Sequence, residues 1–186
     1  MAPKKRVAER RDEPVPAEGQ RLWAPWRYAY LRSLGSGPKA CIFCLGRLSP
    51  AAMRKHLVLF ESPDVLVMLN KYPYNNGHLL VATRNHVASP ELLTRPGRAA
   101  MAEAVAASIK LLREILRPQG FNVGTNIGSA AGAGIADHIH WHVVPRWSGD
   151  NNFTSVLAST RVLSQSLENS YDQLRPIFKN LAAEIS

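Results

Sequence analysis

Three histidines stand at every second position in the run DHIHWHVVPRW, residues 137–147. On a β-strand, alternate side chains share a face. His138, His140 and His142 are therefore expected to project together, while the hydrophobic residues between them face the core. Half of the six histidines of the chain lie in this run, and histidines rarely cluster on a solvated strand face. The run predicts a chemical site rather than a polar surface.

Two kinds of chemistry fit three neighbouring imidazoles. Neutral imidazoles can bind a catalytic metal ion that keeps one open position. Alternatively, one imidazole attacks a phosphorus atom while its neighbours hold its tautomer and donate hydrogen bonds to phosphate oxygens. The glycine-rich segment NIGSAAGAG (126–134) precedes the run, and its backbone N–H groups could face a phosphate. Asp137 is the one carboxylate close by, so phosphate chemistry is favoured and a metal-dependent hydrolase is the alternative.

A second group of candidate ligands begins at Cys41 and Cys44, a CxxC motif that fits a redox dithiol or half of a metal site. The preceding residues GSGPKA (35–40) indicate a loop, whereas a thioredoxin-type motif follows a strand. Structural zinc needs two more Cys or His ligands, and His86 and His138 are the candidates. We therefore expect zinc on these four residues. Unmetallated cysteines, with His86 as a surface histidine, are the alternative, and His56 is left without a role.

Hydrophobic patterning predicts the elements that position these residues. Five strand-like runs, separated by residues typical of turns, are expected at 56–60, 64–69, 77–83, 121–128 and 138–144. Apolar residues at three- and four-residue steps from Arg98 to Arg117 predict an amphipathic helix, which Pro118 and Gly120 end. Five short strands with helices between and after them indicate an α+β fold with an antiparallel sheet.

Two further helical signals flank that pattern. Ser89-Pro90-Glu91 has the composition of a helix start, with serine as the cap and proline at the first helical position. A C-terminal helical segment is expected over 164–183, with a break or kink at Pro176.

Composition points to one soluble globular domain, because 186 residues with 46% hydrophobic and 20% charged side chains suffice for a core. Residues 1–20 are charged and without periodicity, so we expect a disordered basic tail. The domain is expected over 21–186, with an aromatic segment at its start and the helical extension at its end. There is no apolar run of the ~20 residues that span a bilayer and no secretory signal. We therefore expect a cytoplasmic protein without membrane contact.

The net charge is +9, and residues 1–21 hold six basic and four acidic side chains, which leaves +7 for the rest of the chain. A basic domain favours anionic ligands such as nucleotides or polyphosphates, although the charge can also serve solubility. There is no Lys/Arg stripe and no nucleic-acid motif, which argues against nucleic acid as the partner.

Taken together, these motifs resemble the histidine triad (HIT) family. HIHWHVV (138–144) matches its histidines alternating with hydrophobic residues, NKYPYNNGH (70–78) resembles its asparagine and glycine-histidine strand pair, and Asn126-Ile127-Gly128 also matches. The resemblance covers residues 41–146. The flanking LWAPWR, PRWSGDNNF and RVLSQSLENSYDQLRPIF resemble the longer bacterial branch, which is associated with diadenosine tetraphosphate (Ap4A) phosphorylase activity.

The resemblance implies a five-stranded sheet with two main helices, paired into a larger sheet in a homodimer. It implies a nucleotidyl transferase or hydrolase acting on dinucleoside polyphosphates or adenylylated compounds, with Mg²⁺ accompanying a polyphosphate. His140 would be the nucleophile that forms a nucleotidyl-histidine intermediate, with His142 on phosphate oxygens and His78 beside them. Asn70 would bind the ribose and Asn126 a phosphate or the leaving group. The remaining nucleotide contacts implied are Phe43, Gly128 and Gly132.

One position departs from the family pattern. Many members have Gln, Ser or Thr shortly before the histidines, whereas Ala133-Gly134-Ile135 offers no polar side chain here. A nucleotide-binding protein with weak turnover is therefore a second alternative.

Overall fold

The computed structural model describes residues 41–150 and 163–185. The strands are β1 (Val58–Glu61), β2 (Val65–Leu69), β3 (Leu79–Thr83), β4 (Gly120–Gly124) and β5 (His140–Arg146). The α-helices are α2 (Pro50–Lys55), α3 (Arg95–Leu116), α5 (Leu167–Phe178) and α6 (Leu181–Glu184). The tail expected at 1–20 and the aromatic segment after it lie outside the described residues.

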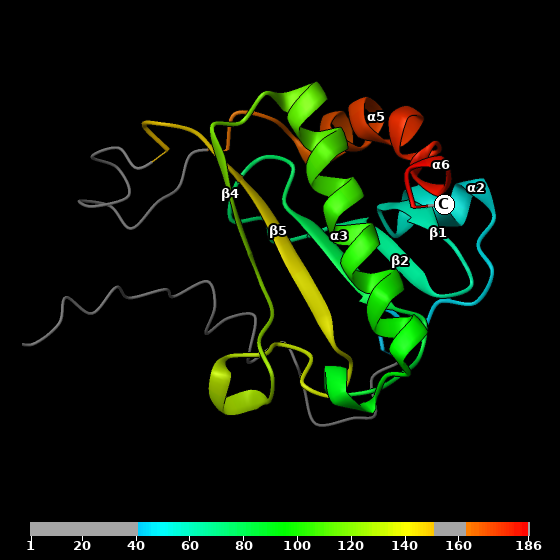
Figure 1. Cartoon of the computed structure of the whole chain (residues 1–186). Helices are drawn as coiled ribbons and strands as arrows, with labels where there is room; N and C mark the ends of the chain where they lie inside the picture. The colour runs from blue at the N-terminus through cyan, green and yellow to red at the C-terminus, as the bar shows by residue number, and fades with distance from the viewer. Residues whose placement is uncertain (1–40, 151–162, 186) are drawn as a thin grey trace, which may run out of the picture.

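The five strands form one antiparallel sheet in the order β1-β2-β3-β5-β4, so the predicted α+β fold is confirmed. Every residue of β2 and β3 is buried, which explains why both read as continuous apolar runs. One face of the sheet packs against α3 and α5 through residues such as Val81, Val143 and Leu174, and Figure 1 shows α3 lying across it. The other face packs on a smaller cluster that includes Phe43 and Met53.

The long helix α3 occupies the predicted region but begins earlier than expected. The Thr94 side chain caps it by accepting from Gly97 N–H, and Pro96 lies in the first turn. The helix start expected at Ser89-Pro90-Glu91 is present, with Ser89 at the N-cap position and Pro90 first, but it gives only one 3₁₀ turn, Pro90–Leu92. The Ser89 hydroxyl donates to the Glu91 carboxylate and makes no cap bond to the backbone.

The C-terminal segment also differs in detail. Ser166 caps α5, and Pro176 lies inside this helix rather than at a break. The helix continues to Phe178, which is fully buried with Leu174, and the chain turns at 179–180 before α6. Helix α2 was not predicted, since only the Ser49 cap and the proline that follows mark its six residues. Within the described ranges, no helix is both long and apolar enough to cross a membrane.

Candidate functional site

Strand β5 begins at His140, so the predicted histidine strand is two residues shorter at its start. His140 lies opposite Ala82 and His142 opposite Leu80 on β3, and these two imidazoles share one face as expected. Ile139, Trp141 and Val143 pack in or against the helix-side core, again as expected. His138 precedes the strand, and its ring serves a different group of residues.

The His140 ring is held in one tautomer. Its Nδ1 donates to the His138 carbonyl oxygen at 2.9 Å, so Nε2 keeps a free electron pair. The side chain is buried, and burial lowers its pKa. Thr125, the residue that follows β4, donates its hydroxyl to the His140 carbonyl at 2.7 Å. Nothing in the sequence singles out this threonine.

His78 and His142 form a chain of hydrogen bonds that fixes two more tautomers. The Tyr74 N–H donates to His78 Nδ1 at 2.9 Å, so His78 carries its hydrogen on Nε2. His78 Nε2 therefore donates to His142 Nδ1 at 3.0 Å, which leaves the hydrogen of His142 on Nε2. The neutral His142 thus presents an N–H on the strand face that also carries His140.

Burial is the main cause that keeps this pair uncharged. Desolvation, followed by the neighbouring histidines, lowers the pKa of His78 to about 3 and that of His142 to about 4. Neutral rings at pH 7 offer one donor and one acceptor each. The site therefore places an electron-pair donor and an N–H donor side by side.

Of the other expected contacts, Asn70 lies next to this chain. Its Nδ2 is 3.4 Å from His78 Nδ1, and its Oδ1 accepts from Tyr72 N–H at 2.9 Å. The ring of Tyr74 covers both His78 and His142, with centroids 4.6 and 5.8 Å away. The sequence did not predict either role of Tyr74. One is a hydrogen bond from the backbone, which does not depend on the residue type, and the other is packing of the ring on two histidines.

The glycine-rich loop is more closed than expected. Gly128 and Gly132 have φ values of +80° and +85°, a conformation that favours glycine. The amides of Gly132 and Ala133 donate to carbonyls within the loop itself, at Ser129 and Gly128. Asn126 is half-buried nearby in the chain.

Phe43 is buried against the histidines rather than open to a ligand. Its side chain is 1% exposed, and its ring centroid lies 5.0 Å from that of His138 and 4.8 Å from that of His140. The neighbouring Ile42 is 47% exposed. A direct contact of Phe43 with nucleotide stays a prediction.

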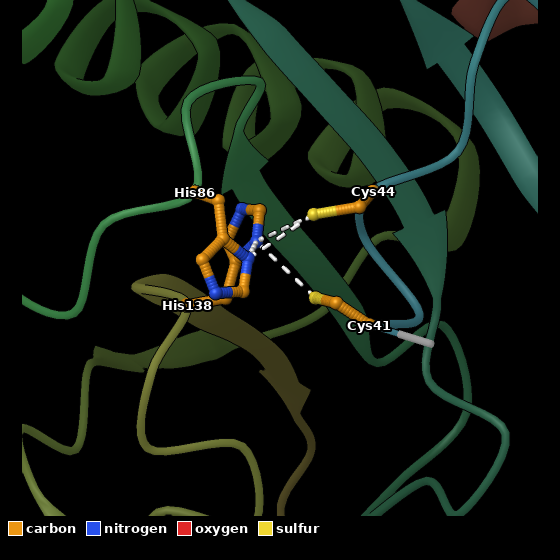
Figure 2. A group of neighbouring side chains, drawn as sticks. All are labelled: Cys41, Cys44, His86 and His138. Carbon is orange, nitrogen blue, oxygen red and sulfur yellow. Dashed lines mark hydrogen bonds between the residues drawn. The ribbon is translucent and has the colours of Figure 1, made fainter. Parts of the chain in front are cut away.

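The structure brings the four expected metal ligands together (Figure 2). The sulfur atoms of Cys41 and Cys44 and the Nδ1 atoms of His86 and His138 all lie within 4.8 Å of one another. Cys41 Sγ is 3.3 Å and Cys44 Sγ 3.6 Å from His138 Nδ1, and Cys44 Sγ is 3.1 Å from His86 Nδ1. The two Nδ1 atoms are 3.2 Å apart. Tetrahedral Zn–S and Zn–N bonds would put such S–N and N–N pairs about 3.3–3.6 Å apart.

The Nε2 atoms of His86 and His138, which point away from the two sulfur atoms, also have the partners that ligating histidines usually have. His138 Nε2 donates to the Thr83 carbonyl at 2.8 Å, and His86 Nε2 lies 3.6 Å from the Asp137 carboxylate. Ligating histidines usually bond a carbonyl or carboxylate in this way. The residues present therefore fit a Cys₂His₂ metal site.

The comparisons with known proteins agree with this geometry. The HIT domain model matches residues 52–149, more than half of the chain. A protein from Mycobacterium tuberculosis named AP-4-A phosphorylase is 36% identical over 158 residues, which are 81% of this chain and 80% of that protein. The chain belongs to the histidine triad family.

Solved structures of the family share the HIT fold with this chain. A zinc-bound histidine triad protein from Mycobacterium smegmatis is 28% identical with a TM-score of 0.58, over 77% of this chain and 96% of that one. A hypothetical histidine triad nucleotide-binding protein from Sulfolobus tokodaii is 24% identical, also with a TM-score of 0.58, over 78% and 93%. The second likeness concerns the fold alone.

Proposed function

We propose that this chain transfers or hydrolyses a nucleotidyl group of dinucleoside polyphosphates such as Ap4A, or of adenylylated compounds, through a covalent intermediate on His140. The proposal rests on one observation, the free electron pair of His140 Nε2 beside the N–H of His142 Nε2. A nucleophile and a hydrogen-bond donor for phosphate oxygens are what such a transfer requires. The mycobacterial AP-4-A phosphorylase supports this substrate class.

In the first step, His140 Nε2 attacks the α-phosphorus. A P–N bond forms and the bond from phosphorus to the leaving oxygen breaks. The leaving polyphosphate departs as an anion with a hydrogen bond from His142 Nε2. The positive charge on the substituted imidazole is stabilised by its Nδ1–H bond to the His138 carbonyl.

In the second step, an oxygen of phosphate or water attacks the same phosphorus. The P–N bond breaks and its electron pair returns to His140 Nε2. When water is the acceptor, its proton is released to solvent. The relative favours phosphate as the acceptor, whereas the apolar Ala133-Gly134-Ile135 leaves an acceptor phosphate without a side-chain donor there.

His78 orients His142 and remains neutral, as its lowered pKa requires. Asn70, beside His78, would bind the ribose, and Asn126 a phosphate or the leaving group. Gly128 and Gly132 would line the pocket through their backbone, with Phe43 at its wall.

We assign zinc to Cys41, Cys44, His86 and His138 as a structural ion, supported by the zinc-bound mycobacterial relative. Four protein ligands leave no open position for water activation. His138 thus belongs to this cluster, and the alternative in which all three histidines of the run bind one catalytic metal is disfavoured. Any Mg²⁺ would come with the polyphosphate substrate.

We also propose a homodimer that extends the sheet through β4. This strand lies at the edge of the sheet, and three of its five residues are exposed. Val123 and, just beyond the strand, Ile127 are 43% and 49% exposed. Among the described residues no strand pairs with the outer side of β4, and a sheet edge with apolar side chains is a ready site for strand pairing.

The test is product analysis of Ap4A incubated with and without phosphate. A phosphorylase yields ADP and ATP only with phosphate, and a hydrolase yields AMP and ATP without it. His140→Ala should lower the rate by several orders of magnitude, with His56→Ala, outside the site, as the control.

Mass spectrometry should find an acid-labile nucleotidyl group on His140. Full activity of His140→Ala would remove the nucleophile assignment, and binding of AMP without turnover would make the chain a nucleotide-binding protein.

A further inference from the structure

We infer that Phe43 couples the Cys₂His₂ cluster to the nucleotide site, so that metal occupancy sets the position of the His140 ring and the affinity for nucleotide. Phe43 is then a positioning residue. This inference rests on the proposed function, because it takes His140 as the residue that meets the nucleotide.

The first support is the place of Phe43 between two metal ligands. The Cys44 N–H donates to the Cys41 carbonyl at 3.2 Å, which closes a short turn with Phe43 inside it. A metal ion that fixes both sulfurs therefore fixes this turn. The Phe43 side chain cannot move far from its pocket while both cysteines are bound.

The second support is the set of contacts around the His140 ring. Phe43 packs on the rings of both His138 and His140 at centroid distances of 5.0 and 4.8 Å, which lie within the range of favourable aromatic pairs. The His140 Nδ1–H bond ends on the carbonyl of His138, itself a ligand. These two restraints on the imidazole lead back to the cluster, whereas a third, the edge contact with the His142 ring at a centroid distance of 5.2 Å, does not. Thr125 restrains the His140 backbone and not its ring.

The third support is the weak attachment of the cysteine segment to the sheet. Residues 41–49 contain no helix or strand. Phe43 is the one fully buried side chain of this segment, and Cys41, Leu45 and Leu48 pack on the same apolar cluster while only partly buried. The hydrogen bonds to the sheet are long: Arg84 Nη2 donates to the Gly46 carbonyl at 3.4 Å, and Leu48 N–H donates to the Glu61 carboxylate at 3.3 Å. Within the described part of the chain this segment makes few backbone hydrogen bonds to the sheet, and such segments open readily. A metal ion would therefore determine how firmly Phe43 is held.

The experiment measures reciprocal coupling in the folded, zinc-loaded protein. If zinc strengthens AMP binding, AMP must strengthen zinc binding by the same factor. Zinc affinity is measured by competition with a chromophoric chelator, without AMP and with AMP at saturation for each variant. The variants are wild type, Phe43→Ala, Phe43→Leu and Met53→Ala. Met53 belongs to the same apolar cluster, so its truncation controls for lost packing.

In wild type and Met53→Ala, AMP should raise zinc affinity about tenfold, within the usual range of coupled sites. In Phe43→Ala the increase should vanish, and Phe43→Leu should restore part of it. Metal-free wild type that stays folded by circular dichroism should bind AMP as weakly as Phe43→Ala does with zinc. An equal increase in wild type and Phe43→Ala, or none in wild type, would overturn the coupling. If wild type binds no AMP at all, the proposed function itself fails.

Discussion

The histidines of this site differ in which ring nitrogen is engaged. His140 donates through Nδ1 and frees Nε2, whereas His142 accepts at Nδ1 and presents Nε2–H. His138 donates through Nε2 and turns Nδ1 toward the cysteines. The hydrogen bond of each ring therefore determines the chemistry of that histidine, because it decides whether the imidazole can attack, donate a hydrogen bond or bind a metal ion.

Asp137 should strengthen metal binding through His86, since its carboxylate lies 3.6 Å from the outer nitrogen of that ring. Asp137→Asn should lower zinc affinity about tenfold, the lower end of such effects, because the carboxylate is exposed. Competition with a chelator measures the zinc affinity. The control is Asp64→Asn, which replaces an exposed carboxylate in the turn between β1 and β2. An equal loss of zinc affinity in this control would refute a specific role for Asp137.

The buried neutral His78 should make folding stability depend on pH. Its pKa is lowered to about 3 in the fold from the ordinary histidine value of 6.5, so its contribution to stability is complete well above pH 6.5. Below that pH the unfolded chain binds a proton that the fold excludes, and the free energy of unfolding falls. When the pH falls from 7 to 5, the free energy of unfolding should therefore decrease in both proteins. The decrease should be smaller in His78→Gln than in wild type, by up to about 2 kcal/mol.

Urea unfolding at the two pH values measures this difference. The metal ligands are identical in both proteins, so acid release of metal contributes equally to each. Parallel losses of stability in the two proteins would show that His78 is not kept neutral by the fold.

At the scale of elements, the segment between β2 and β3 positions His78 and depends on Gly77. Its φ is +72°, and a Cβ atom there would lie 2.5 Å from Leu116 Cδ1 at the end of α3. Asn75 fixes the same segment to the end of β5, through the Pro145 carbonyl and the Asp150 carboxylate. The histidine thus follows a turn that is locked from two sides.

Gly77→Ala should therefore destabilise the protein by about 1–2 kcal/mol, mainly the cost of left-handed backbone at alanine, with a smaller cost for moving the Leu116 side chain. It should also lower turnover, since His78 is the next residue. Gly120→Ala is the matched control, because it has open space around it and should change stability by less than about 0.5 kcal/mol. Denaturant titration compares them, and equal effects would contradict the steric argument.

The sequence predicted elements well where the pattern was strong. Strands β1, β2 and β3 and the centre of α3 follow from continuous apolar runs and helical spacing, and the grouping of Cys41, Cys44, His86 and His138 was expected from their residue types. Helix α2 and the ends of β4 and β5 could not be predicted, because short caps and loop glycines decide them. The roles of Thr125, Thr83 and the Tyr74 amide depend on contacts between distant segments, which periodicity does not encode.

At the scale of the whole molecule, the open β4 edge carries the prediction of a dimer. Val123→Asp should place a charge in the proposed interface and yield monomers by light scattering after size exclusion. Leu92→Asp changes a side chain that is 61% exposed in a different part of the fold, and it should leave the assembly unchanged. A monomeric wild type, or dissociation by both substitutions, would remove the β4 interface.

Zinc bound at the Cys₂His₂ cluster would also have a consequence for folding. Cys41 and His138 are 97 positions apart, so an ion that joins them is a cross-link around most of the sheet. In a chain-entropy treatment, closing a loop of about 100 residues disfavours the unfolded state by about 4–5 kcal/mol. The ion would thus act as a reversible cross-link, formed only after β5 has paired with β3 and His138 has reached Thr83, and its release would open that loop at once.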